Sequence, residues 1–312
     1  MRGSTGIGES AMNILITGMA GMLGSNIAFL LRNKHSVFGI DTNTVQIKHT
    51  TSFDVSAIDV EAVAQILVNN HIDVVIHCAA LVNVDACEEN PGYANAVNYA
   101  MTKNLHYLCK LHNIKMVFIS TDAVYSGNKN GLNAEDDETA PISVYGKTKL
   151  EAENAVLRDS SALILRTNMY GFNYRPKNSF GEWVVQELSK EKTLNMFYDV
   201  MFSPILVNDL VRIIDLCLKK NISGLYNVGC QGSISKYDLG CLIQQEFGLP
   251  GEIRRASMHD FNFVAPRTEN MGLDTCRIQS ALSIVLPTPQ ENVKDFKRLY
   301  DVGYSKNLKL GV

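Results

Sequence analysis

Residues 13–24 have the sequence NILITGMAGMLG, a short apolar run followed by three evenly spaced glycines. The run at 13–17 predicts a buried strand, and residues 25–32 predict the helix that follows it. Glycines at this spacing allow a tight turn and a close approach of the backbone to a pyrophosphate, which the free N–H groups of a helix N-terminus also bind. The G-x-x-G-x-x-G turn is a variant of the dinucleotide fingerprint. The residues that we expect to bind a dinucleotide here are Gly18, Gly21, Met22, Leu23 and Gly24.

The alternation of strand and helix continues through the first half of the chain. Apolar runs predict further strands at 36–40, 74–76, 115–120 and 162–166. Amphipathic spacing predicts further helices at 58–69, 94–112 and 143–157. The strands lack the two-residue alternation of a half-exposed sheet, so both faces of the sheet should be covered. We therefore expect an α/β fold with a Rossmann-like, doubly wound parallel sheet.

The second half is less regular and punctuated by prolines. It contains predicted helices at 179–189, 208–219 and 236–247 and a predicted strand at 225–228. We divide the chain into a disordered leader or tag (1–11), a dinucleotide-binding domain (12–170) and a smaller C-terminal substrate-capping domain (171–312). A segment near 197–220 is expected to return to the first domain.

Composition excludes several classes of protein. The 312 residues carry a net charge of -3 without a basic stretch, which argues against a nucleic-acid partner. No apolar run is long enough to span a bilayer, so we expect a cytoplasmic protein without a membrane partner. The seven cysteines are scattered and none forms a C-x-x-C pair, so neither a metal site nor a disulfide framework is indicated.

An acidic residue follows the second predicted strand. Asp41 is placed to accept hydrogen bonds from an adenosine ribose, and its carboxylate would repel a 2′-phosphate. NAD(H) is therefore favoured as cofactor, and NADP(H) stays open. Asp54 and Val55 lie in the next predicted loop, where they would meet the adenine edge.

A tyrosine and a lysine begin a predicted helix. Tyr145 and Lys149 are four residues apart and share one face, while Lys147 points elsewhere. An ammonium near a phenol favours the phenolate and lowers its pKa toward the working range. Thr121 ends the preceding strand, at the edge of the sheet where α/β sites lie. We expect these three side chains to be catalytic.

These motifs together resemble the extended short-chain dehydrogenase/reductase family, and most closely its dTDP-4-dehydrorhamnose reductase branch. The resemblance covers nearly the whole chain from Met12. It is also carried by residues 73–80, 84–98 and 165–167, by Asp199 with Ser203-Pro204, and by 266–267 leading to 273–274. It implies NAD(P)H-dependent reduction of a 4-keto nucleotide sugar, in deoxysugar or surface polysaccharide biosynthesis.

The resemblance implies a role for each site residue. Tyr145 would donate a proton, Lys149 would hold the nicotinamide ribose and tune Tyr145, and Thr121 would hydrogen-bond the substrate carbonyl. The residues implied to line the cofactor cleft are Ala79, Ala80 and Val82. The predicted substrate contacts are Thr121, Asp122, Asn168, Asn178 and Arg267.

Departures from the branch leave alternatives open. Residues 167–171 lack the tryptophan usual in the branch and look more like the epimerase branches, so a nucleotide-sugar epimerase is one alternative. A 4,6-dehydratase typically needs Asp-Glu after the threonine, whereas Asp122 is followed by Ala123. The regulatory subunit of methionine adenosyltransferase resembles the same branch, so a non-catalytic NAD(P)-binding subunit is another. A homodimer also stays open.

Overall fold

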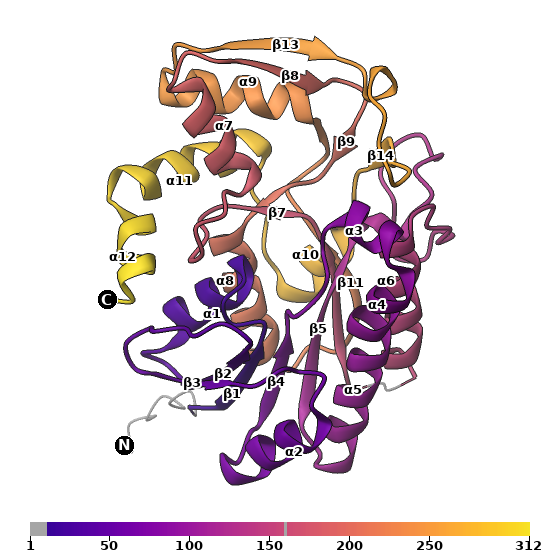
Figure 1. Cartoon of the computed structure of the whole chain (residues 1–312), viewed down its shortest axis with the longest axis vertical. Coiled ribbons are helices and arrows are strands. Elements are labelled where there is room, and N and C mark those ends of the chain that lie inside the picture. The colour runs from indigo at the N-terminus through magenta and orange to yellow at the C-terminus, as the bar shows by residue number, and fades with distance from the viewer. Residues whose placement is uncertain (1–10, 159–160) are drawn as a thin grey trace, which may run out of the picture.

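The computed structural model describes residues 11–158 and 161–312, so the predicted leader lies outside the described residues except for Ala11. Its centre is a parallel sheet of seven strands in the order β11-β6-β5-β4-β1-β2-β3 (Figure 1). The strands are β1 (Asn13–Thr17), β2 (Ser36–Asp41), β3 (Thr50–Asp54), β4 (Val74–His77), β5 (Lys115–Thr121), β6 (Leu163–Thr167) and β11 (Gly224–Val228). The predicted doubly wound α/β fold is confirmed.

Helices cover both faces of the sheet because alternate side chains of each strand point to opposite sides. Ile14 and Ile16 of β1 belong to one buried core, and Leu15 belongs to the other. The helices over the first core are α1 (Met22–Leu31), α8 (Val207–Lys219) and α10 (Cys276–Leu282). Those over the second are α2 (Val60–Asn69), α5 (Met101–Leu111) and α6 (Val144–Val156).

One edge strand, β3, was missed by the sequence prediction, whereas the other, β11, matches the strand predicted at 225–228. β3 has the polar sequence TTSFD and was missed because only one of its residues is strongly apolar. Asp54 therefore ends a strand, and its predicted position in a loop is wrong. At the other edge, β11 pairs with β6, so the chain rejoins the sheet beyond residue 220. The predicted helix 94–112 is divided into α4 (Pro91–Asn95), a π-helical turn (Ala96–Ala100) and α5, and α3 (Val84–Glu89) precedes it.

The remaining elements form a second layer beside the carboxyl ends of the strands, at the top of Figure 1. Its strands are β7 (Met169–Tyr170), β8 (Thr193–Phe197), β9 (Met201–Phe202), β10 (Ile205–Leu206), β12 (Ile234–Ser235), β13 (Glu252–Ala256) and β14 (Asn270–Met271). Its helices are α7 (Phe180–Leu188), α9 (Lys236–Phe247), α11 (Pro289–Asp301) and α12 (Tyr304–Leu310). They share one apolar core, in which Phe172 and Phe296 pack with ring centroids 4.9 Å apart.

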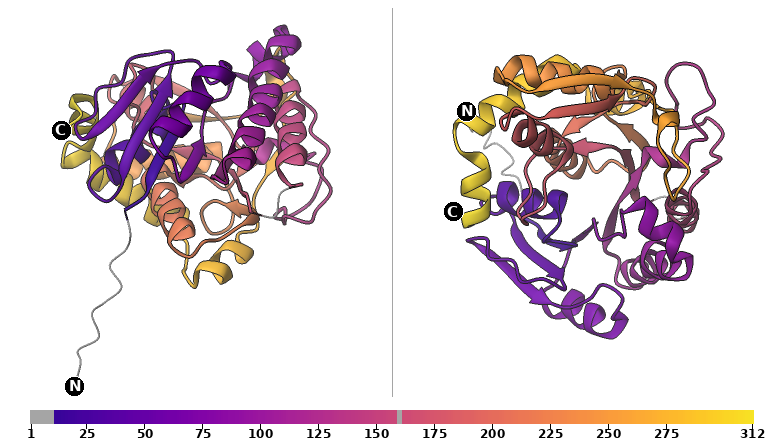
Figure 2. Two further views of the ribbon diagram at one scale, coloured as in Figure 1. Left: turned by 90° about the horizontal axis from the view of Figure 1, so that it is seen from below. Right: turned by 45° about the horizontal axis from the view of Figure 1, so that its top comes forward.

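The C-terminal helix ties this layer to the glycine-turn helix. The Tyr304 hydroxyl donates to Asn26 Oδ1 at 2.8 Å, and Asn26 Nδ2 donates to the carbonyl of Phe172 at 2.8 Å. Figure 2 shows the yellow C-terminal helices beside the indigo N-terminal segment. In the described part of the chain no helix is both long and apolar enough to cross a membrane.

Candidate active site

A cleft of about 950 Å³ opens where the strand ends meet the second layer. Parallel strands bring their carboxyl ends to one edge of a sheet, which explains why residues from distant parts of the chain meet here. The predicted residues that line the cleft are Gly18, Gly21, Met22, Leu23, Gly24, Asp41, Val55, Ala79, Ala80, Val82, Thr121, Asp122, Tyr145, Lys149, Asn168, Asn178 and Arg267. Asp54 is outside this lining.

The glycine turn leaves no room for side chains. Gly18 has a φ of +70°, a conformation that favours glycine, and a Cβ there would lie 2.8 Å from the backbone of Ala79. A Cβ on Gly24 would lie 2.3 Å from the carbonyl oxygen of Gly18. The turn therefore packs directly on the end of β4 and on its own helix. Its bare backbone faces the cleft at the start of α1, which suits a pyrophosphate.

Asp41 is held rigidly beside this turn. One carboxylate oxygen accepts from the N–H of Ala20 at 3.0 Å, and the other accepts from the backbone N–H of Asn43 at 3.0 Å. Each oxygen keeps further acceptor capacity for a ribose hydroxyl. Two exposed basic residues, Arg175 and Lys177, also line the cleft from the loop before α7. The sequence analysis did not find them because they lie far along the chain from the predicted motifs.

The three expected catalytic residues are close together. Thr121 ends β5, and its side chain lines the cleft together with Tyr145, with which it interacts electrostatically. Tyr145 and Lys149 lie on the same face of α6, which begins after Ser143, whose side chain accepts from the N–H of Gly146. Lys147 is exposed, as predicted.

The prediction of a lowered Tyr145 pKa is wrong, because burial raises it. The Lys149 ammonium donates to the carbonyl oxygen of Ile119 at 2.7 Å and lies 4.1 Å from the centre of the Phe118 ring. Burial raises the pKa of Tyr145 well above its ordinary value, and the nearby Asp122 carboxylate adds to this effect. Burial also lowers the pKa of Lys149 to about 8. A phenol that keeps its proton at neutral pH is suited to donating it.

Asp122 joins the neighbouring substrate residues in one polar cluster. Its carboxylate accepts from Asn168 Nδ2 at 2.7 Å and from the hydroxyl of Thr121 at 3.1 Å. Burial raises the pKa of Asp122 to about 6. The hydroxyl of Thr167, which also lines the cleft, is buried without a hydrogen-bond partner in the structure. This cluster can accept a polar ligand.

Two cations face the cleft from the second layer. Arg267 forms an ion pair with Asp85 of α3 at 2.7 Å and lies 4.9 Å from the ring centre of Phe263. Lys236, the first residue of α9, also lines the cleft and was missed by the sequence analysis. Burial lowers the pKa of Lys236, and repulsion from Arg267 adds to this. The capping residue Ser235 predicts that a helix begins at Lys236, but it does not predict that Lys236 faces the cleft.

The fold, the glycine turn and the grouping of Thr121, Tyr145 and Lys149 in one cleft are those of an NAD(P)-dependent oxidoreductase. The family described as "RmlD substrate binding domain" matches residues 12–301. The chain belongs to this family.

Similar proteins include several reductases. The chain is 32% identical to a protein of Haloferax volcanii named "Probable low-salt glycan biosynthesis reductase", over 90% of this chain and 96% of that protein. A crystal structure of a dTDP-4-dehydrorhamnose reductase from Clostridium acetobutylicum has a TM-score of 0.83 at 29% identity, covering 93% of this chain and all of that one. The chain is also 29% identical to the bovine (Bos taurus) methionine adenosyltransferase 2 subunit beta, over 88% of this chain and 84% of that protein. The predicted resemblance to the dTDP-4-dehydrorhamnose reductase branch is confirmed.

Proposed function

We propose that this protein is an extended short-chain dehydrogenase/reductase that reduces the 4-keto group of a nucleotide sugar. The observation that supports this most directly is the grouping of Thr121, Tyr145 and Lys149 in the lining of one cleft. The names of the similar reductases from Haloferax and Clostridium agree with it. We infer a place in deoxysugar or surface polysaccharide biosynthesis in the cytoplasm.

The cleft residues have distinct tasks in this reaction. A bound reduced nicotinamide cofactor supplies the hydride, and negative charge develops on the carbonyl oxygen of the sugar. Tyr145 gives that oxygen a proton, and the hydroxyl of Thr121 donates a hydrogen bond to it. Lys149 holds the nicotinamide ribose with its ammonium. The glycine turn would hold the pyrophosphate and Asp41 the adenosine ribose.

The direct test follows NADH or NADPH oxidation with a panel of nucleotide-linked 4-keto sugars and identifies the sugar product. Consumption of stoichiometric cofactor with formation of an alcohol supports the reductase. Interconversion of sugars without net cofactor consumption would instead identify an epimerase. If the protein binds NADH but turns over no keto sugar, the reductase proposal fails, and capture of a partner enzyme would then test the role of a regulatory subunit.

Asp41 is expected to set the preference for NADH. In Asp41→Ala a partly buried acceptor and a repelling charge are lost, so affinity for NADH should fall roughly 10- to 100-fold, while affinity for NADPH changes less. Fluorescence titration with both cofactors measures this. Asp54→Ala is the matched control, because Asp54 ends the neighbouring strand outside the lining of the cleft. An unchanged NADH preference in Asp41→Ala would exclude Asp41 as the selector.

Arg267 is expected to bind the diphosphate of the substrate by charge-assisted hydrogen bonds. Arg267→Ala should therefore weaken the affinity for a nucleoside diphosphate such as dTDP roughly 10- to 100-fold, as measured by calorimetry. Asp85 holds the guanidinium in the described structure and would compete with phosphate for it. Asp85→Asn should therefore bind dTDP at least as tightly as the parent. Unchanged affinity in Arg267→Ala would remove Arg267 from the substrate site.

A further inference from the structure

The catalytic face of α6 carries a third functional group one turn beyond Lys149. Glu153 is 0% exposed and lies four residues after Lys149, as Lys149 lies four residues after Tyr145. Both oxygens of its carboxylate accept from Arg166 Nε at 3.1 Å, and one accepts from the terminal NH2 at 2.8 Å. We propose that Glu153, held by Arg166, is a positioning residue that fixes Lys149 and the Thr121-bearing strand relative to each other.

The contact with Ser120 gives the first step of the argument. The hydroxyl of Ser120 donates to the Glu153 carboxylate. Ser120 lies between Ile119, whose carbonyl accepts from the Lys149 ammonium at 2.7 Å, and Thr121, which lines the cleft with Tyr145 and interacts with it electrostatically. Glu153 therefore binds the same three-residue end of β5 that Lys149 and Tyr145 contact. A shift of this strand end would change both catalytic contacts at once.

Arg166 extends the restraint to the neighbouring strand and to a long loop. It lies on β6, directly before the cleft residues Thr167 and Asn168. A terminal nitrogen of its guanidinium donates to the Tyr125 hydroxyl at 2.8 Å and to the carbonyl of Glu135 at 3.3 Å. The ion pair thus joins α6, β5, β6 and the segment that follows β5.

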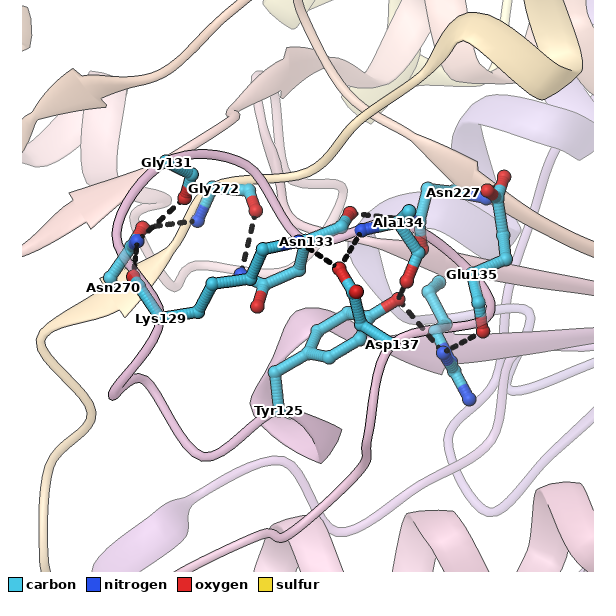
Figure 3. Close-up of polar contacts among 11 residues, drawn as sticks. Tyr125, Lys129, Gly131, Asn133, Ala134, Glu135, Asp137, Asn227, Asn270 and Gly272 are labelled. Carbon is cyan, nitrogen blue, oxygen red and sulfur yellow. Dashed lines mark hydrogen bonds and ion pairs between the residues drawn. The ribbon is translucent and has the colours of Figure 1, made fainter.

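The loop is in turn bound to the edge strand β11 and to the second layer. Figure 3 shows Tyr125, Ala134 and Asn227 together: the Tyr125 hydroxyl donates to the carbonyl of Ala134 at 2.9 Å and to Asn227 Oδ1 at 3.1 Å. Asn133 of the same loop donates from Nδ2 to the carbonyl of Gly272 at 2.8 Å. The cluster around Arg166 therefore has little freedom to move, which a positioning role requires.

The effect of the Glu153 charge on the pKa of Lys149 distinguishes a positioning role from simple packing. The titratable groups that interact with the Lys149 ammonium are Glu153, His77 and Cys78. Burial lowers the pKa of His77 to about 3 and raises that of Cys78 to about 12, so both are neutral near pH 7. Glu153, which forms an ion pair with Arg166, is the charged group of the three. Its carboxylate raises the pKa of Lys149, against the burial that lowers it to about 8.

The test must separate positioning from folding, because removal of one partner leaves a buried unpaired charge. The double variant Glu153→Leu/Arg166→Met replaces both charges with apolar side chains, which is often neutral for stability. We expect a melting temperature close to that of the parent and a kcat lowered up to about 100-fold with a smaller change in KM. The alkaline limb of the pH profile should move toward acid, because the Glu153 carboxylate raises the pKa of Lys149 in the parent.

Two single variants complete the design. Glu151→Gln removes a carboxylate from the exposed side of the same helix and should leave both kcat and the pH profile unchanged. Glu153→Asp keeps the charge but shortens the reach, so it should lower kcat while the alkaline limb stays near that of the parent. If the double variant does not fold, the kcat and pH profile of Glu153→Asp still test the proposal.

The kinetic measurements rest on the proposed reductase activity, so a titration without substrate is included. NMR of protein labelled with 13C at lysine Cε, with the Lys149 signal assigned by its loss in Lys149→Met, measures the pKa of Lys149 directly. A lower pKa of Lys149 in the double variant supports the proposal even if no keto sugar is turned over. An unchanged pKa of Lys149, or an unchanged kcat in both Glu153 variants, would overturn it.

Discussion

Tyr145→Phe should lose nearly all turnover while keeping the fold and the cofactor site. The substitution keeps the ring and its packing but removes the proton that the proposed mechanism transfers to the carbonyl oxygen. General acid catalysis of this kind contributes about 10²- to 10⁴-fold, so kcat should fall by roughly that factor. The raised pKa of Tyr145 means that the parent holds this proton at neutral pH. Stopped assays of NADH oxidation with a 4-keto nucleotide sugar measure the loss.

The control for this variant is Tyr93→Phe. Tyr93 also lines the cleft, but it is largely exposed and lies on α4 away from the Thr121–Tyr145 contact. Its variant should retain turnover, and both variants should melt like the parent and bind NADH equally well. Turnover at the parent's rate in Tyr145→Phe would contradict the proposed mechanism at its central step.

The fold could be predicted from local pattern where that pattern is strong. The run at Asn13–Thr17 is wholly buried apart from its first residue, so its apolar sequence directly reflects its place in the sheet. β3 could not be found this way, because an edge strand with the sequence TTSFD is held by backbone pairing with β2 rather than by apolar burial. The place of β11 in the sheet also depends on long-range pairing, which local pattern does not encode.

The candidate site could be predicted where its residues belong to one short sequence motif. The glycine turn and the Tyr145–Lys149 pair are short patterns with a direct physical meaning. Lys236 has no such signal, because its place at the cleft depends on how the second layer packs over the sheet. The error about the Tyr145 pKa has the same origin: helical spacing gave the face shared with Lys149, but not the burial that raises the pKa of Tyr145.

Lys149→Met should impair turnover and cofactor binding together. Methionine has a similar length but no charge, so the proposed hold on the nicotinamide ribose is lost, and affinity for NADH should fall roughly 10- to 100-fold. Turnover should fall at least as much, since the cofactor is then held less well. Lys147→Met, on the exposed side of the same helix, is the matched control and should change neither quantity. Normal turnover in Lys149→Met would contradict the assigned role.

The stability of Lys149→Met provides a second, independent measurement. Burial lowers the pKa of Lys149 from 10.5 to about 8, so between these values the folded parent binds fewer protons than its unfolded chain. The stability contributed by this site therefore rises with pH across that window, whereas below about pH 8 the full cost of burying the ammonium applies. Lys149→Met buries no charge and therefore lacks this cost. The difference in free energy of unfolding, variant minus parent, should therefore be largest below pH 8. That advantage should shrink by up to about 3 kcal/mol as the pH rises toward 10.5. Denaturant unfolding of both proteins at pH 7 and pH 10 measures the difference, and a gap that widens with pH would show that Lys149 is not buried as a charged group.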